Sequence, residues 1–150
     1  MVGLRQILVP LLSLAGVLAA PFEKKPEPVV TYLGNQGPIL SGGAFTTKGI
    51  VYTAGTVPSF NGSIVEGGIA NQTAQVIENI AVILEEAGTS WDYVLKTTVF
   101  LASMDDYAAM NEVYRSLLPD PKPARTAVEV GQLPGDFLIE IEAIAALPDC

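Results

Sequence analysis

The chain has 150 residues and a net charge of −8, and 49% of its residues are hydrophobic against 16% that are charged. This size and composition predict one folded domain, and the acidic balance argues against nucleic acid or an anionic membrane surface as a partner. The chain has no histidine and one cysteine, Cys150, which excludes histidine-dependent catalytic triads, most zinc sites and an intrachain disulfide.

Residues 1–19 have the pattern of a targeting segment. Arg5 precedes an apolar run over 7–18, and Val17-Leu18-Ala19 places small residues where a signal peptidase cleaves. The run is too short to cross a bilayer, which takes about 20 helical residues. We therefore predict a signal peptide at 1–19, a secreted or secretory-pathway location, and no membrane segment in the mature form. A mitochondrial or cytosolic location is the alternative.

Residues 20–36 are expected to form an extended lead-in to the domain, because prolines and charged side chains dominate their first half. The domain itself is expected at 37–150. Its first elements are two strands at 44–45 and 50–53, on either side of a turn. Asn61-Gly62 indicates a further tight turn.

The rest of the chain predicts helices and strands in alternation. Apolar residues at helical spacing, followed by Gly88, indicate the first helix, and Asp105 or Asp106 is expected to cap the second. Runs rich in β-branched residues indicate strands. The expected elements are a helix at 69–87, a strand at 94–101, a helix from 107 to 117 or 118, and strands at 126–130 and 138–146. The predicted fold is thus an α+β sheet of order ββαβαββ, with both helices on one face.

The last predicted strand is apolar on both of its faces. Ile139, Ile141, Ala143 and Ala145 share one face, whereas Leu138 and Ile144 lie on the other. Two helices on one side leave the second face without a cover inside the chain. Such a face is usually covered by another subunit, so the pattern predicts a homo-oligomer.

Two charged residues interrupt the strand patterns near the end of the chain. Arg125 opens one strand and Glu140 lies inside the next. A charge in a mostly apolar sheet is costly unless it meets a partner or a ligand. From the residues alone, Arg125 is either a ligand-binding group or the structural partner of Glu129, Glu140 or Glu142.

Several separate motifs, in the same order, resemble the RidA/YjgF family of small trimeric deaminases. They are Val94-Leu95-Lys96-Thr97-Thr98-Val99-Phe100-Leu101, Tyr107-Ala108-Ala109-Met110-Asn111, Pro123-Ala124-Arg125-Thr126, Val128-Glu129-Val130, Leu133-Pro134-Gly135-Asp136 and Ile139-Glu140-Ile141-Glu142-Ala143-Ile144-Ala145. The resemblance implies a chorismate-mutase-like α+β sheet that assembles as a homotrimer, with pockets between the subunits.

The resemblance also implies a reaction, the hydrolysis of 2-imino acids or enamines to 2-keto acids and ammonia, without metal or cofactor. By this resemblance, Arg125 binds the substrate carboxylate through two parallel hydrogen bonds, and Glu140 activates the attacking water. The backbone carbonyl of Ala127 helps to hold that water. Asn111 lines the pocket, and Gly55 lets the backbone approach the ligand.

The chain departs from the family pattern at the rim of the expected pocket. The usual tyrosine of a Gly-Pro-Tyr loop is missing after Gly37-Pro38, and Ala54-Gly55-Thr56 stands where Ser-Gly-Gln is common. These departures predict an altered substrate preference of a 2-iminobutanoate/2-iminopropanoate deaminase-like hydrolase. The alternative is a non-enzymatic protein that binds small carboxylate metabolites through Arg125.

Overall fold

The computed structural model describes residues 30–34, 43–46 and 49–148. The predicted signal peptide at 1–19 and Cys150 lie outside these residues. The elements are β1 (Val30–Leu33), β2 (Gly43–Thr46), β3 (Ile50–Thr53), β4 (Ser59–Phe60), β5 (Ser63–Ile64), α1 (Gly68–Glu86), the short 3₁₀ turn η1 (Trp91–Tyr93), β6 (Val94–Leu101), the 3₁₀ turn η2 (Met104–Asp106), α2 (Tyr107–Leu117), β7 (Ala124–Glu129) and β8 (Ile139–Ala146). Neither described α-helix is long and apolar enough to cross a membrane.

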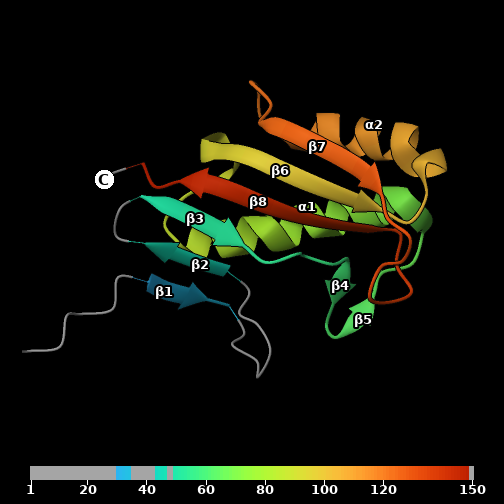
Figure 1. Cartoon of the computed structure of the whole chain (residues 1–150), viewed down its shortest axis with the longest axis horizontal. Coiled ribbons are helices and arrows are strands. Elements are labelled where there is room, and N and C mark those ends of the chain that lie inside the picture. The colour runs from blue at the N-terminus through green and yellow to red at the C-terminus, as the bar shows by residue number, and fades with distance from the viewer. Residues whose placement is uncertain (1–29, 35–42, 47–48, 149–150) are drawn as a thin grey trace, which may run out of the picture.

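The fold has two layers, a six-stranded sheet and two helices on one of its faces (Figure 1). The strand order is β1-β2-β3-β8-β6-β7, and only β6 and β7 run parallel to each other. The predicted order ββαβαββ and the placement of both helices are confirmed. β1 extends the sheet beyond β2, so the sheet begins before residue 37, the predicted start of the domain.

The sequence signals for the ends of elements are mostly confirmed. Asn61 and Gly62 have φ values of 49° and 81° in the turn between β4 and β5, a tight hairpin turn. Gly88 follows α1 with a φ of 82°, which only glycine adopts without strain. Asp106 occupies the N-cap position of α2, as predicted, but its side chain makes no capping hydrogen bond. The Ser103 hydroxyl accepts from the backbone N–H of Asp105 instead, because the chain first forms η2.

The hydrophobic core lies between the helices and the central strands. Val99 and Leu101 of β6 and Ile139 and Ile141 of β8 are fully buried against Ile80 and Leu84 of α1 and Met110 of α2. Each such aliphatic side chain contributes about 1.5–3 kcal/mol relative to an exposed one. The core therefore fixes which residues of β6 and β8 face the helices, and the alternate residues face the other way.

The opposite face of the sheet, which we call the open face, is not covered by either described α-helix. It is the face toward the viewer in Figure 1. Tyr52 on β3 and Val128 on β7 are 51% and 40% exposed there. The strand register places on it Tyr52, Lys96, Thr98, Phe100, Thr126, Val128, Glu140, Glu142 and Ile144. Aromatic and aliphatic groups thus share the open face with two carboxylates and one lysine.

Candidate functional site

Arg125 lies on the helix-facing side of the edge strand β7. It pairs in register with the buried Thr97 of β6, and α2 packs along this edge. The guanidinium lies 4.6 Å from the ring centroid of Tyr114 and 5.7 Å from that of Tyr107. Its Nη2 donates to the Tyr107 hydroxyl at 3.3 Å, and its Nη1 lies 3.7 Å from the Met110 sulfur. Two aromatic rings and one sulfur thus surround the charge.

No carboxylate pairs with Arg125 among the residues that the structure describes. Glu129, one of its predicted partners, accepts from the backbone N–H of Met104 at 2.7 Å. Glu140 and Glu142, the other two, lie on the open face, on the far side of the sheet. Within one chain, Arg125 therefore forms no ion pair with any of these three glutamates.

A cavity of about 430 Å³ lies beside Arg125, lined also by Asn111, Tyr114, Arg115, Lys122 and Pro123. The other two cations are already paired. Arg115 binds Glu112 at 3.2 Å, and Lys122 binds Asp120 at 2.8 Å while it donates to the carbonyl of Leu118. The Asn111 amide makes no hydrogen bond to another described residue. Among the described residues, the cavity thus has one cation without a carboxylate partner, Arg125, and one amide without a hydrogen bond, that of Asn111.

The backbone of β7 adds an acceptor to this edge. The N–H of Val130 donates to the carbonyl of Leu101 on β6 at 2.9 Å. Backbone groups alternate in direction along a strand, so Ala127, three residues earlier, directs its carbonyl away from β6. No described strand pairs with that edge. The Ala127 carbonyl, two residues from Arg125, is therefore not used in pairing with any described strand.

Glu140 lies on the open face, opposite Phe100 of β6. The carboxylate lies against the backbone of Gly55, where the Cβ of any other residue would overlap its Oε1. Burial raises the pKa of the Glu140 carboxyl, and the nearby negative charge of Glu142 raises it further. Such a carboxylate is a stronger base than an exposed glutamate, which suits a group that takes a proton from water.

The structure divides the predicted site residues into two groups. Arg125, Asn111 and the Ala127 carbonyl lie together at the edge of β7, whereas Glu140 and Gly55 lie together on the open face. Arg125 on β7 is level with Ala143 on β8, which is the second strand along from β7. Ala143 lies three residues from Glu140 on that same strand. This separates the backbones of Arg125 and Glu140 by about 10 Å along the strands and about 10 Å across them. One chain alone does not bring the two charges together.

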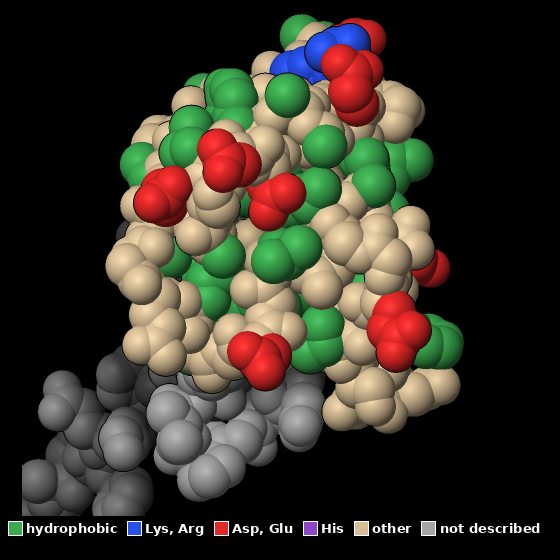
Figure 2. Space-filling view, turned by 90° about the vertical axis from the view of Figure 1, so that its right-hand side faces the viewer, with side chains coloured by type: hydrophobic (Ala, Val, Ile, Leu, Met, Phe, Trp, Pro, Cys, Tyr) green, Lys and Arg blue, Asp and Glu red, His purple; other side chains and the backbone are tan. Residues whose placement is uncertain are grey.

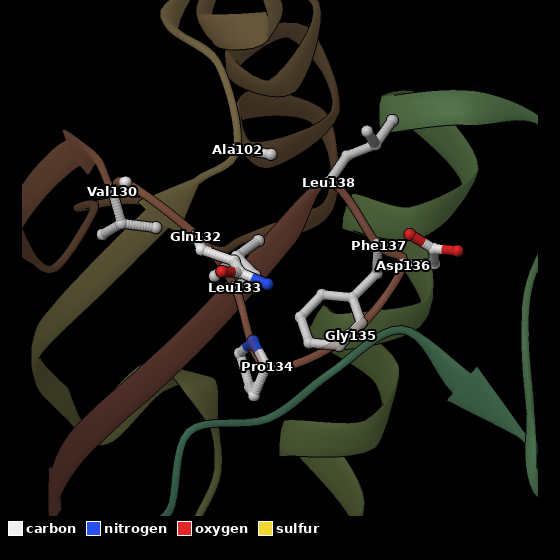
Figure 3. A pocket seen from close by; sticks show the side chains of 10 residues that line it. Ala102, Val130, Gln132, Leu133, Pro134, Gly135, Asp136, Phe137 and Leu138 are labelled. Atoms are coloured by element: carbon white, nitrogen blue, oxygen red, sulfur yellow. The ribbon is translucent and has the colours of Figure 1, made fainter.

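A second, larger cavity of about 670 Å³ lies at the loop between β7 and β8 (Figure 3). Asp136 is the only ionisable side chain in its lining, and the Phe137 ring packs beside Gly135. It contains none of the predicted site residues. Within the described part of the chain, no group of three or more His, Cys, Asp or Glu side chains could hold a metal ion. The smaller cavity at Arg125 is therefore the candidate site.

The sequence did not identify the aromatic surroundings of Arg125. The helical spacing assigns Tyr107, Met110 and Tyr114 to the apolar face of α2, and Met110 and Tyr114 are indeed buried. Their second role depends on the parallel pairing of β6 with β7, which brings Arg125 beneath α2. Two tyrosines spaced seven residues apart on one helix face are a weak signal without that pairing.

The fold and these groups define a class of protein, an α+β sheet protein with an arginine beside a cavity at the edge of its sheet. Residues 40–147 match the family described as Endoribonuclease L-PSP. The chain belongs to this family, which is also the family of the RutC and RidA/YjgF proteins.

Relatives in the family span archaea and eukaryotes. A RutC family protein of Pyrococcus abyssi is 46% identical, over 82% of this chain and 91% of the relative. Protein mmf1, mitochondrial, of Schizosaccharomyces pombe is 45% identical, over 68% of this chain and 65% of the relative. The mouse protein named 2-iminobutanoate/2-iminopropanoate deaminase is 41% identical, over 63% of this chain and 72% of the relative.

Solved structures share the fold. Yeast Mmf1 superposes with a TM-score of 0.74 at 32% identity, over 78% of this chain and 98% of that one. E. coli TdcF with bound serine superposes with a TM-score of 0.70 at 31% identity, over 80% of this chain and 98% of that one. The predicted family and α+β fold are thus confirmed.

The contribution of Glu142 to the Glu140 environment is directly measurable. Glu142→Gln removes a negative charge from the same strand face, so we expect the pKa of the Glu140 carboxyl to fall. It should stay above the ordinary value of a glutamate, because burial is the larger cause and is unchanged. Carboxyl ¹³C NMR titration of both proteins measures this shift. An unchanged or raised pKa in Glu142→Gln would contradict the assignment.

Proposed function

We propose that this protein hydrolyses 2-imino acids, or their enamine tautomers, to 2-keto acids and ammonia. The observation that carries the proposal is the guanidinium of Arg125, which faces a cavity without a carboxylate partner among the described residues. A planar guanidinium grips a carboxylate through two hydrogen bonds, a geometry that lysine lacks. The mouse deaminase to which the chain is similar supports the same chemistry.

In the proposed reaction Arg125 binds the substrate carboxylate and Asn111 lines the pocket beside it. Water, held by the Ala127 carbonyl, attacks the carbon of the C=N bond as the Glu140 carboxylate takes its proton. That proton passes to the nitrogen and gives a carbinolamine, with a hydroxyl and an amino group on the same carbon. The hydroxyl proton then moves through Glu140 to the nitrogen, the C=O bond forms as the C–N bond breaks, and ammonia leaves a 2-keto acid. The reaction consumes one water and needs no metal or cofactor.

We propose further that the complete site forms between subunits of a homotrimer. Arg125 and Glu140 lie too far apart within one chain, on opposite sides of the sheet. The open face carries exposed Tyr52 and Val128, which a second subunit would bury. Glu140 of one subunit would then meet Arg125 of its neighbour.

The altered pocket rim points to an altered preference among imino acids. The Thr56 hydroxyl donates to the Ala54 carbonyl at 3.2 Å, so that donor is already engaged. Ala54 itself offers the ligand no polar side chain. A substrate with a less polar side chain fits this rim better. The alternative function, non-enzymatic binding of small carboxylates, keeps Arg125 and its cavity but involves no turnover.

Turnover separates the two functions. An amino-acid oxidase generates 2-imino acids in solution, and the protein should then accelerate keto acid release above the spontaneous rate. Arg125→Lys should chiefly raise KM, because substrate and transition state both carry the carboxylate. Glu140→Gln should lower kcat by about 10²–10⁴, the usual effect of a general base, and leave 2-keto acid binding intact. Binding without acceleration would establish the non-enzymatic function, and full kcat in Glu140→Gln would refute the water-activating role.

Mixing two inactive variants tests the site between subunits. Arg125→Ala and Glu140→Gln chains, unfolded and refolded together, should regain about a quarter of the wild-type activity. In a cyclic trimer of random composition, about one interface in four pairs an intact Arg125 with an intact Glu140. The same variants refolded separately and then combined are the control. Light scattering should give three times the chain mass. If the refolded mixture recovers no activity, the Arg125 and Glu140 that act together do not come from two different chains.

Gly55 gives a test of the Glu140 position. Its backbone is not in the left-handed region, so alanine is compatible with it. The new methyl group would displace only the end of a flexible glutamate. We expect the free energy of unfolding of Gly55→Ala to stay within about 0.5 kcal/mol of the wild-type value. Its kcat should be at least about tenfold lower. Gly131→Ala is the matched control, because its Cβ would meet nothing within 4 Å. Full activity in Gly55→Ala would contradict a catalytic role for the Glu140 carboxylate in its position against Gly55.

The location is a separate inference. The relative from S. pombe is mitochondrial by name, which favours the mitochondrial alternative over secretion, and the comparisons do not support secretion. The chain with a fluorescent protein at its C-terminus, expressed in yeast, should therefore co-localise with a mitochondrial marker. The same fusion without residues 1–19 is the control and should stay in the cytosol. Fusion protein in the medium would instead support the signal peptide.

A further inference from the structure

Tyr107, the first residue of α2, contacts the Arg125 guanidinium without belonging to the lining of the candidate cavity. Its hydroxyl accepts the hydrogen bond from Nη2 at 3.3 Å, and its ring centroid is 5.7 Å from the guanidinium carbon. Tyr107 is not among the residues that line the cavity, whereas Asn111 and Tyr114, on the same face of α2, are. Tyr107 therefore touches the cation that binds the ligand and does not line the space for the ligand.

The two tyrosines differ in what holds them. Tyr114 is 5% exposed, and its hydroxyl shares a 2.8 Å hydrogen bond with Thr97, inside the core. Tyr107 is 36% exposed, and its hydroxyl contacts Arg125 alone among the described residues. Tyr114 thus belongs to the packing of the fold, while Tyr107 contributes little to the core.

An arginine without an acidic partner needs another means of orientation. A free arginine side chain samples many rotamers, and that freedom is lost when a ligand binds. A carboxylate would restrict the side chain but would also neutralise it. Tyrosine restricts it without neutralising it, through a ring face and a hydroxyl acceptor. Two of the five guanidinium N–H groups point to Tyr107 and Met110, and three remain for a carboxylate.

We propose that Tyr107 is a positioning residue that presents the Arg125 guanidinium to monocarboxylate ligands. Its ring supports the charge and its hydroxyl holds Nη2, so that the three remaining N–H groups are kept in place for a carboxylate. This rests on the proposed function only for the identity of the carboxylate. Tyr107 raises ligand affinity and takes no part in the chemical step.

The probe for this role is 2-oxobutanoate, a 2-keto acid of the product class, titrated into the full chain by calorimetry. Tyr107→Phe keeps the ring and removes the hydroxyl, and it should raise Kd by about 3–10-fold. Tyr107→Leu also removes the ring and should raise Kd by about 10–50-fold. KM for 2-imino acids should rise in parallel while kcat changes less than about twofold. In an Arg125→Lys background, Tyr107→Phe should change Kd by less than about twofold, because lysine lacks the planar guanidinium that Tyr107 orients.

Tyr93→Leu is the matched control, since Tyr93 is also an exposed tyrosine, at 45%, on the short turn η1. It should leave Kd unchanged, and its melting temperature should match that of Tyr107→Leu. Wild-type Kd in both Tyr107 variants would overturn the proposal, and so would a loss confined to kcat. A melting temperature lowered in Tyr107→Leu and not in Tyr93→Leu would assign Tyr107 a structural role. If Tyr107→Leu does not fold, Tyr107→Phe decides alone.

The same measurements separate this inference from the proposed reaction. Tyr107-dependent binding of 2-oxobutanoate without turnover of 2-imino acids would overturn the hydrolysis and support the positioning role. Turnover with KM unaffected in the Tyr107 variants would support the hydrolysis and overturn the positioning role. A wild-type protein that neither binds 2-oxobutanoate nor turns over 2-imino acids would overturn both.

Discussion

The rest of the candidate site depends on Arg125, whose guanidinium is contacted by aromatic rings and not by an acidic side chain. Arg125 gains cation–π contacts with Tyr107 and Tyr114, each worth about 0.5–2 kcal/mol according to its desolvation. These contacts offset part of the cost of taking the charge from water while leaving it unneutralised. An acidic partner would give the fold more local stability and would compete with every carboxylate ligand. The arrangement therefore leaves the Arg125 charge without a neutralising partner among the described residues, which is the condition that the proposed carboxylate binding requires.

The position of this arginine follows from one parallel strand pair in an otherwise antiparallel sheet. α2 connects β6 to β7, so β7 runs alongside β6 at the edge and the helix packs over both. Arg125 then faces α2, while Glu140, on the middle strand β8, faces the opposite side. The two charges are divided by the sheet itself. Water activation and carboxylate binding can therefore meet only across an interface, which links the proposed catalysis to assembly.

The sequence was sufficient for the parts of the structure that local patterns determine. The helical spacing of α1, the β-branched run of β6 and the Asn61-Gly62 turn each lie where the residues predict them. The order of strands was not accessible, because β3 pairs with β8, nearly a hundred residues later, through backbone contacts that leave no mark on side-chain patterns. The charges Arg125 and Glu140 could be identified because they interrupt local strand patterns. Their separation by the sheet and the aromatic partners of Arg125 could not, because both depend on the order of the strands. Capping also depended on context: Asp106 stands at the N-cap of α2 without a side-chain capping bond, and the capping serine, Ser103, belongs to the preceding turn η2.

The charge distribution bears on which anions such a site accepts. Figure 2 shows one end of the molecule, where acidic side chains are spread over the face and basic ones, among the described residues, gather at its upper edge. At physiological salt the repulsion from these carboxylates is screened beyond about 8 Å. A small monocarboxylate that enters the cavity therefore responds mainly to Arg125, because the other two cations there are paired. RNA would extend its phosphates over a surface of net charge −8 and meet repulsion along its length. Although the family description names an endoribonuclease, the electrostatics of this chain favour a small carboxylate as its ligand.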